Sequence, residues 1–483
     1  MYVAALMLML SYALKTANQM LFLIIAVLLL ISGCVLYGIK QNKAFIFSAI
    51  LLSVFCIRAV SSLAAIEKLE MQGDIQANIV ATVTETPTFY SENNYGSCSI
   101  RVDECEQGIV ENGSLLLLVG DGVTNLSVGD RVTAEVIISV MDGVGKYSFY
   151  SENLYARAEA INVVFGQKQT KGIYGFAGIV QRHIKSTLIK NTDNYGILLA
   201  LITGERSYIS NELYECIKIS GVSHILVVSG MHFAVIFGFL FKAINCLPVK
   251  SIIRDLFLLF VLFLMMSICG FSVSVLRAGF VYVFIIIYRW LNRNGDSMLS
   301  LANAMILILI LEPFAFFSIA FQLSFASTFG ILVLANKIKN FFSPETRNNK
   351  ITGSLVSVLS VSLSAYIATF LIVIYHFGYI STYSIIVNLL VSIPANYMLI
   401  FAVMGVVLGS IPYVSSILLN LSDLLAYYFK SVSVYFANLP ISVIPLKNEK
   451  LLVAIILITI FVVFVYKTGF IKKLKRGDRC DAV

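Results

Sequence analysis

The chain alternates between long apolar runs and short polar loops, and one polar region of about 100 residues interrupts this pattern. A helix needs about 20 apolar residues to cross a bilayer, so most of the runs predict membrane-spanning helices. We predict three spans in residues 1–66 and a core of roughly eight spans in residues 221–466. The run at 414–436 contains Asp423 and Lys430, and an interfacial helix is the alternative there. The runs lie at 2–14, 20–39, 44–65, 222–241, 256–269, 275–290, 298–311, 314–334, 353–375, 381–408, 414–436 and 451–466.

Residues 67–165 lose the helical period and alternate apolar and polar side chains over short segments. Turn signals such as Asn112-Gly113 and Gly129-Asp130 separate these segments. Five short strands of this kind predict a small closed β-barrel, and an OB-like barrel is one solution of that size. The predicted strands are 75–83, 97–102, 114–119, 131–139 and 158–164.

Residues 166–220 connect the predicted barrel to the core. They begin with a basic, mildly amphipathic stretch from Lys168 to Lys190. A helix of that composition suits the plane of a membrane interface. We therefore predict amphipathic linker helices on the outer membrane surface.

Composition and charge agree with a multi-pass membrane protein. The 483 residues are 58% hydrophobic and only 13% charged, with a mean hydropathy of +0.87. Lys and Arg gather in alternate loops and in the basic tail 467–483, which we place in the cytoplasm. The prediction is a polytopic α-helical membrane protein with an inserted extracytoplasmic OB-like β-domain and a cytoplasmic C-terminus. No cleavable signal is evident.

Cys98 and Cys105 form the one pair of cysteines inside residues 67–165. They flank a predicted hairpin, and an extracytoplasmic domain permits oxidation, so a disulfide is predicted. Two unpaired thiols are the alternative.

The segment 221–237, GVSHILVVSGMHFAVIF, places polar groups inside an apolar run: His224, Ser229, Gly230 and His232. Unpaired polar groups in lipid cost several kcal/mol or so, so polar residues at membrane depth indicate a transport pathway or a site. An unbroken helix would put the two histidines roughly on one side, whereas Gly230 and the flanking Ser229 make a helix break or close packing equally possible. The alternative role is hydrogen bonding between helices.

The same segment predicts neither a metal site nor a catalytic nucleophile. Two histidines without acidic or Cys neighbours do not complete a zinc shell, and Ser229 lacks the G-x-S-x-G pattern. We therefore predict no metal, no cofactor and no catalytic residue.

Arg277 is the most informative single residue of the later apolar runs. An arginine there should extend its charged group to the membrane surface, pair with an acid or face water. Gly270 and Gly279 on either side of it favour close helix packing or a re-entrant break. Gln322 and Asn388 add polar groups deep in two further runs.

Four segments occur in an order that resembles the ComEC-type competence proteins, the DNA-uptake channel of the bacterial inner membrane. They are 200–213 with Glu205 and Arg206, 221–232, 270–279 and 321–325, followed by His376-Phe377-Gly378 and Asn388-Leu389-Leu390. The resemblance runs from the start of the chain to about residue 440.

This resemblance implies a channel that passes single-stranded DNA inward during natural transformation. We expect His224, Ser229, Gly230, His232, Arg277, Gln322 and Asn388 to line the transport pathway. We expect Glu205, Arg206, Gly270 and Gly279 to have structural or gating roles. Longer members carry a C-terminal metallo-β-lactamase-like domain thought to degrade one DNA strand, and we expect this chain to be a short, non-enzymatic form without it.

The expected partners follow from the same resemblance. They are single-stranded DNA, membrane lipid, a DNA receptor, a cytoplasmic helicase or motor, single-stranded-DNA-binding proteins, a separate nuclease and a second copy of the chain. A separate motor is expected because the chain shows no P-loop. A channel or transporter for another anionic polymer or solute is the alternative function, and a scaffold without transport is a third.

The charge distribution complicates DNA binding by the barrel. Residues 67–165 contain five basic and fifteen acidic residues, a formal charge of −10, whereas the rest of the chain carries +18. Because Lys and Arg neutralise phosphates in nucleic acid complexes, the basic stretch 168–190 is the better outer candidate for phosphate contact.

Overall fold

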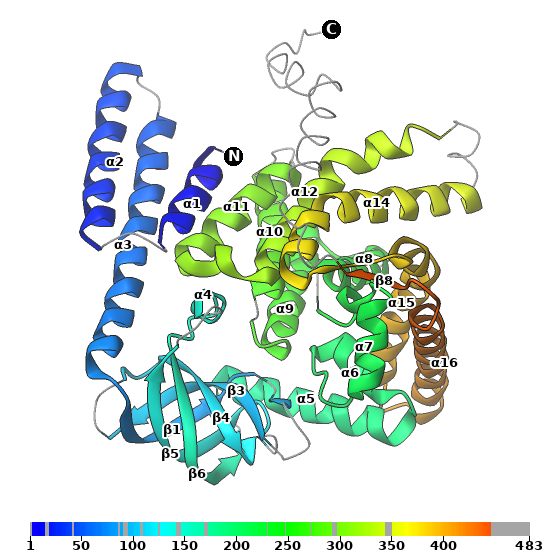
Figure 1. The fold of residues 1–483 in the computed structure, drawn as a ribbon. Helices are drawn as coiled ribbons and strands as arrows, with labels where there is room; N and C mark the ends of the chain where they lie inside the picture. The colour runs from blue at the N-terminus through cyan, green and yellow to red at the C-terminus, as the bar shows by residue number, and fades with distance from the viewer. Residues whose placement is uncertain are drawn as a thin grey trace, which may run out of the picture.

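A computed structural model describes residues 2–445, except 15–18, 41–42, 86, 90–94, 107–109, 124–125, 142–145, 169–171, 229, 247, 272, 292–296 and 343–349. The predicted span 451–466, the basic tail 467–483 and the candidate Ser229 lie outside the described residues. Figure 1 shows a group of N-terminal helices, a β-barrel below them and a larger body of helices beside both.

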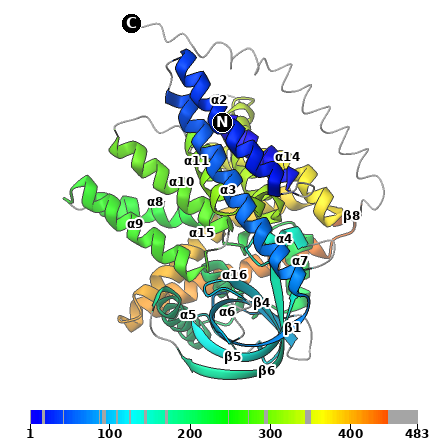
Figure 2. The same ribbon diagram turned by 90° about the vertical axis from the view of Figure 1, so that its left-hand side faces the viewer.

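The N-terminal group consists of α1 (Tyr2–Ala13), α2 (Gln19–Lys40) and α3 (Lys43–Gln72). Helices α2 and α3 lie side by side, and α3 continues without a break to the barrel (Figures 1 and 2). The buried side chains Phe22 and Phe55 belong to one apolar cluster with side chains of α11 (Ser297–Leu311) and the 3₁₀ helix η3 (Pro313–Phe317). The first predicted span is a helix of only 12 residues.

The five predicted strand segments all fall on strands of one closed barrel. Its strands follow the order β1-β5-β6-β4-β3, and β3 pairs again with β1 to close the ring. Only β4 and β6 run parallel, and the other neighbouring pairs are antiparallel. The elements are β1 (Ile75–Val83), β2 (Thr88–Phe89), β3 (Tyr95–Cys105), β4 (Leu115–Asp121), β5 (Asp130–Val140), α4 (Lys146–Tyr150) and β6 (Ala156–Lys168).

The alternating pattern explains the barrel interior. Along β5 the buried side chains are Val132, Ala134, Val136 and Ile138, each two residues from the next. Successive strand side chains point to opposite faces, so these apolar positions fill one interior. Burying a Val or Ile side chain contributes about 1.5–3 kcal/mol, which makes the apolar face the main source of barrel stability.

The predicted disulfide is wrong, because Cys98 and Cys105 are both free thiols. Both lie on β3, seven residues apart, so the strand itself separates them by about 23 Å. A disulfide needs Cα atoms within about 7 Å. The odd spacing also points the side chains to opposite faces: Cys98 is buried in the barrel and Cys105 is half-buried. The hairpin turn therefore comes after Cys105, not between the two cysteines.

The remaining helices build the larger body. Five helical segments of the described chain are long and apolar enough to cross a membrane: Ile46–Met71, Ser251–Ile268, Ile319–Lys339, Thr352–Phe377 and Ser384–Val407. The elements are α5 (Gly172–Asn191), α6 (Tyr195–Thr203), α7 (Asn211–Ile219), η2 (Ser223–Ile225), α8 (Gly230–Asn245), α9 (Ser251–Ile268), α10 (Val273–Trp290), α12 (Ile319–Lys339), α14 (Lys350–Phe377), β7 (Tyr379–Ser381), α15 (Ser384–Val407), α16 (Pro412–Ala437) and β8 (Val443–Pro445).

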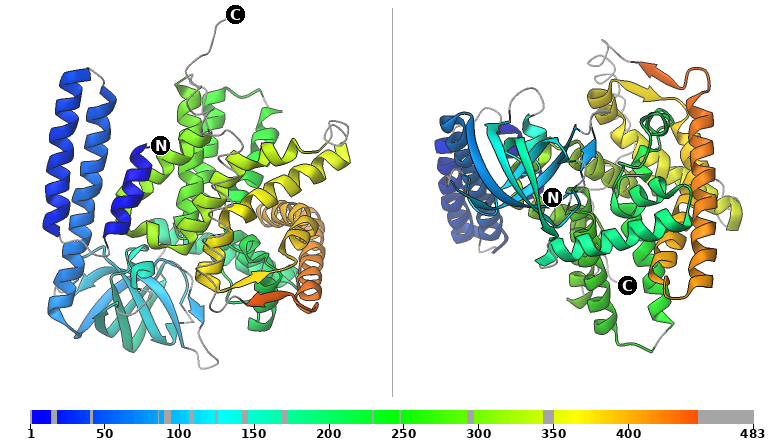
Figure 3. Two further views of the ribbon diagram at one scale, coloured as in Figure 1. Left: turned by 45° about the horizontal axis from the view of Figure 1, so that its top comes forward. Right: turned by 90° about the horizontal axis from the view of Figure 1, so that it is seen from below.

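Two apolar clusters hold this body together. One cluster joins α5, α6 and α7 to α15 and α16. Helices α15 and α16 lie side by side (Figure 3). The other joins α8, α9 and α10. Helix α6 is buried from Gly196 to Leu201 and is not amphipathic, whereas α5 presents both buried and exposed side chains.

Two of the contacts between the barrel and the helical body involve α4 and α5. The rings of Tyr147 and Tyr150, on α4, pack against Phe314 and Phe317 of η3, with centroids 5.2–6.4 Å apart. On the other side, a Cβ at Gly178 of α5 would lie 2.0 Å from the Val128 carbonyl oxygen, so only glycine permits this contact. The barrel is therefore anchored both to η3 and to α5.

Candidate functional site

The polar segment between α7 and α8 is a break in the helical structure. Helix α7 begins after Ser210, whose hydroxyl accepts from the Leu213 amide, a typical N-cap. The chain then turns at Gly221 with φ +80°, where a Cβ would lie 2.4 Å from Ser384 Cβ. Only glycine combines that conformation with so close an approach. The segment therefore crosses the start of α15 as irregular backbone before α8 begins at Gly230.

This break separates the two predicted histidines. His224 lies in η2 and is exposed, whereas His232 lies in the first turn of α8 and is 1% exposed. They do not share one helix face, so the helix-break alternative describes this segment. Irregular backbone at membrane depth occurs where protein buries it or where it lines a water-filled cavity.

His224 belongs to a polar cluster between η2, α14 and α15. Its ring interacts with the Asn388 side chain and the Gly221 backbone. Asn388 Nδ2 donates to Ser362 Oγ at 2.8 Å, and Ser392 Oγ donates to Asn388 Oδ1 at 2.7 Å. Two pathway candidates, His224 and Asn388, are thus brought together.

Arg277 lies at the border of α8, α10 and α12 and is 5% exposed. Its Nη1 donates to Thr328 Oγ1 at 2.6 Å and to the Ser324 carbonyl at 3.1 Å, and its guanidinium lies 5.9 Å from the Phe325 ring centroid. Nε has no hydrogen-bond partner among the described residues.

No described carboxylate lies within ion-pair distance of Arg277. Removing a charge from water without a partner costs several kcal/mol. Arg277 is therefore a buried guanidinium whose charge no described carboxylate balances.

Gln322 forms a third, separate contact. Its Oε1 lies 2.9 Å from His376 Nε2, and its Nε2 donates to the Phe316 carbonyl at 2.9 Å. Among the described hydrogen bonds, none joins Gln322 or Asn388 to Arg277. Asn388 with His224, Arg277, and Gln322 therefore lie in three separate polar clusters.

The four residues assigned structural or gating roles all lie at close contacts. Glu205 pairs with Lys185 at 3.5 Å, and Arg206 Nη1 donates to the Tyr214 hydroxyl at 2.8 Å. A Cβ at Gly279 would lie 2.4 Å from the Met266 sulfur, so α10 packs directly on α9. Gly270 has φ +71°, and a Cβ there would approach Glu85 Cγ to 3.3 Å. The turn before α10 therefore touches the barrel.

A buried ion cluster that was not predicted from the sequence lies at the other end of α10. Asp255 is 1% exposed and accepts from Arg289 Nη1 at 2.7 Å, Trp290 Nε1 at 3.1 Å and Arg254 Nε at 3.3 Å. The signal was an acid at the start of an apolar run, next to Arg254. This cluster ties α9 to α10.

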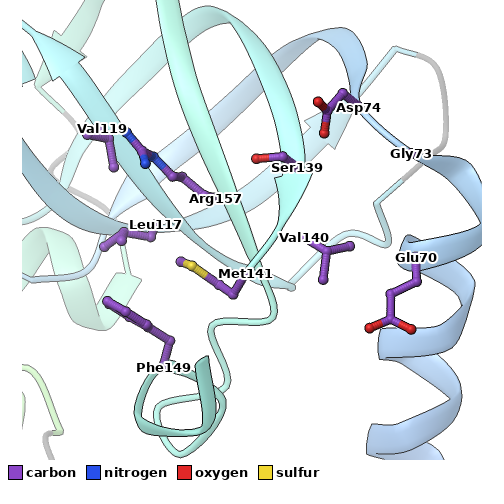
Figure 4. A pocket seen from close by; sticks show the side chains of 10 residues that line it. All are labelled: Glu70, Gly73, Asp74, Leu117, Val119, Ser139, Val140, Met141, Phe149 and Arg157. Carbon is purple, nitrogen blue, oxygen red and sulfur yellow. The ribbon is translucent and has the colours of Figure 1, made fainter. Parts of the chain in front are cut away.

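The barrel offers acidic surroundings rather than a phosphate site. A cavity of about 820 Å³ between α3 and the barrel is lined by Glu70, Asp74 and Arg157, together with apolar side chains (Figure 4). Arg157 is the one basic residue that lines this cavity, and it already forms an ion pair with Glu159 at 2.6 Å.

Two carboxyl groups of the barrel titrate above their ordinary range. Burial raises the pKa of Glu85, and the hydrogen bond from Ser99 Oγ at 2.9 Å opposes part of that rise. Desolvation and the charge of Glu85 raise the pKa of Glu152 to about 7.

The basic stretch 168–190 is partly engaged within the protein. Arg182 pairs with Asp130 of the barrel at 3.6 Å, and Lys185 pairs with Glu205. Within the residues that the structure describes, no group of three or more His, Cys, Asp or Glu side chains is placed to hold a metal ion.

The helices, the barrel and the polar clusters define a multi-pass membrane protein with a small β-barrel domain and a polar region between its helices. The model of the Competence protein family matches residues 201–470, more than half of the chain, and the chain belongs to that family. It is also similar to ComE operon protein 3 of Bacillus subtilis (strain 168), with 30% identity over 201 residues. These residues make up 41% of this chain and 24% of that protein. No solved structure matches the chain.

Proposed function

We propose that this protein forms a membrane path through which single-stranded DNA enters the cytoplasm during natural transformation. Membership of the Competence protein family and the name of its Bacillus relative support a role in competence. The observation that carries the proposal is Arg277, a buried cation without a carboxylate partner in the described chain. A phosphate group supplies the missing negative charge.

The physical argument follows from the surroundings of Arg277. Low-dielectric walls strengthen the attraction between the guanidinium and a phosphate compared with a surface site. Uncharged polar groups of the other clusters, such as Asn388 and Gln322, would offer hydrogen bonds to bases and sugars without holding the charged backbone. One cation rather than many allows the polymer to bind and still move on, a requirement of conduction.

In this proposal the barrel acts as an extracytoplasmic docking domain, not as the DNA grip. Its formal charge of −10 repels phosphate, and Arg182 and Lys185 of α5 are engaged in ion pairs. The protein would sit in the bacterial inner membrane with the barrel outside and the C-terminus in the cytoplasm. It would work without catalysis of its own, with a DNA receptor, a cytoplasmic motor and single-stranded-DNA-binding proteins.

The test is uptake of labelled DNA by a strain that lacks its own competence channel and carries this chain. Internalised, nuclease-protected DNA above the level of the empty strain is the expected result. Uptake indistinguishable from the empty strain, with the protein inserted at normal abundance, would contradict the proposal and favour transport of another anionic polymer or solute. A matched strain carrying Arg277→Gln shows whether the uptake depends on the proposed path.

A further inference from the structure

We infer that Glu312 is a protonation-dependent latch, which holds the loop after α4 against the helical body and releases it when the carboxyl group loses its proton. Glu312 lies between α11 and η3. Its backbone is fixed, because its amide donates to the Ile308 carbonyl at 2.7 Å and Pro313 follows it. The side chain does not cap η3, so it is available for a contact outside its own helix.

The Glu312 side chain reaches the barrel, next to α4 (Figure 1). Asn153, in the loop between α4 and β6, donates through Nδ2 to Glu312 Oε1, and its Oδ1 accepts from the Tyr155 hydroxyl at 2.9 Å. Asn153 has φ +59°, a left-handed conformation that asparagine adopts more readily than most residues. The Ser62 side chain of α3 also interacts with Tyr155. One carboxyl group thus stands where the barrel loop, the N-terminal helices and the core meet.

The surroundings of Glu312 suit the neutral acid better than the carboxylate. Oε2 is buried and has no hydrogen-bond partner among the described residues. Arg58 of α3 lies near enough to act on Glu312 by its charge, but no described ion pair joins the two side chains. Burying a charge without a partner is costly. Burial accordingly raises the pKa of Glu312 to about 8, although Arg58 and the hydrogen bond from Asn153 oppose part of that rise.

The sign of the pH effect follows from this pKa. Because the folded-state value lies above the ordinary 4.5, the stabilisation of the closed junction is complete below pH 4.5 and is lost as pH rises through about 8. Above that pH the junction contains a charge, and water reaches this charge only when the loop moves away from η3.

The other ionisable groups at the junction do not supply this effect. The charged side chains of the neighbouring elements are Arg58 of α3 and Lys146 of α4, and α11 and η3 contain no charged residue. Burial raises the pKa of Tyr155 to about 12, so its phenol keeps its proton when Glu312 titrates. Glu152, in the same loop, has a pKa of about 7 and therefore needs a control variant.

The experiment measures hydrogen exchange of the backbone amides of residues 151–154 in the full-length protein in detergent. These amides donate to carbonyls of α4. A helix of five residues is not stable alone, so they are protected only while α4 packs on η3. After correction for the intrinsic rate, the opening constant should rise about tenfold between about pH 7 and about pH 9, as a closed-state pKa of about 8 requires. Glu312→Gln keeps the shape but has no proton to lose, so it should abolish this rise.

Two further variants make the test specific to the contact. Glu152→Gln should retain the rise, which separates Glu312 from the other carboxyl group of the loop. Asn153→Asp keeps the side-chain shape but places a carboxylate against Glu312, so it should speed exchange of the same amides at about pH 7. Adding Glu312→Gln to Asn153→Asp exchanges the donor and acceptor roles, and the double variant should recover the protection.

Three results would overturn the latch: no rise in the wild-type protein, a wild-type rise in Glu312→Gln, or no recovery in the double variant. Thermal midpoints identify any variant that is unfolded, and the recovery in the double variant keeps the test valid if Asn153→Asp alone is unstable. The measurement uses no DNA, so its outcome is independent of the proposed function.

Discussion

Helix α10 carries two arginines, twelve residues apart, in opposite surroundings. Arg289 near its end shares the buried Asp255 with Trp290 and Arg254. Arg277 near its beginning donates hydrogen bonds to a hydroxyl and a backbone carbonyl, and it pairs with no described carboxylate. The same residue type on the same helix thus has a complete set of partners at one end and an incomplete set at the other.

The difference indicates two roles for buried charge. A buried charge with all its partners fixes the relative position of two helices, here α9 and α10. A buried charge with free donors costs folding free energy unless a ligand completes it. Carboxylates can escape this cost by binding a proton, and burial shifts the pKa of Glu85 upward, in that direction, but arginine cannot lose its charge in this way. Arg277 is therefore the stronger indication of a ligand.

The largest effect, a loss of stability, is expected from breaking the Asp255–Arg289 ion pair at the end of α10. Asp255→Leu leaves Arg289 and Arg254 without their carboxylate, and breaking a buried pair costs about 3–5 kcal/mol. Because Arg289 is 40% exposed, the lower end of that range applies. Membrane abundance and the thermal midpoint in detergent should both fall. The double variant with Arg289→Leu should recover part of the loss, and no recovery would show that Asp255 acts otherwise.

The next effect concerns the unpaired end. Arg277→Lys keeps the charge but loses the planar fork, so it should retain part of the uptake that Arg277→Gln loses. Both variants should insert at wild-type abundance, because neither breaks an ion pair of the described chain. Labelled-DNA uptake per inserted molecule provides the measurement. Equal loss of abundance in both variants would instead make Arg277 a structural residue like Arg289.

A smaller effect is expected at the hydroxyl that orients Arg277. Thr328→Val removes the 2.6 Å acceptor of Nη1 while preserving side-chain shape, at a cost of about 0.5–1.5 kcal/mol for one hydrogen bond. Uptake per molecule should fall a few-fold with unchanged abundance. Thr369→Val on α14, whose hydroxyl bonds only within its own helix, is the control. Identical uptake in the two variants would remove Thr328 from the site.

The smallest effect is a pH dependence in the barrel. The raised pKa of Glu85 means that the folded barrel holds this proton more tightly than the unfolded chain does. The resulting stability is complete below the ordinary carboxyl pKa of 4.5 and is lost as pH rises toward the folded value. The neighbouring Glu152, with a pKa of about 7, follows the same sign.

Hydrogen exchange of barrel amides in the full-length protein should therefore speed up between about pH 5 and about pH 7, beyond the intrinsic pH effect. Glu85→Gln should flatten this pH dependence, because it removes the titrating carboxyl group. It also removes the negative charge that helps to raise the pKa of Glu152. An unchanged dependence in that variant would show that other groups control barrel opening.

The barrel could be predicted from the sequence because its signals are local. Alternation in segments such as 131–139 and turn pairs such as Gly129-Asp130 specify strands without knowledge of distant contacts. The disulfide prediction failed because it needed the position of one hairpin turn, and β3 instead continues through both Cys98 and Cys105. Helix α4 was not predicted, since five residues carry no helical period.

The polar residues of the core could be predicted singly but not as contacts. An arginine or asparagine in an apolar run stands out by composition, so Arg277 and Asn388 were found. Their partners Thr328 and Ser362 are ordinary residues of spanning helices, and only the packing of α10 on α12 and of α14 on α15 selects them. Asp255 remained hidden because its partner Arg289 lies 34 residues further along the chain.

The most direct test of the account compares Arg277→Gln with Arg289→Gln in one uptake assay, normalised to inserted protein. We predict that Arg277→Gln inserts normally and that its DNA uptake per molecule falls about tenfold or more. Arg289→Gln should insert poorly, and the molecules that remain should transport normally. Normal uptake per molecule in Arg277→Gln would contradict the central claim that the unpaired arginine serves the substrate.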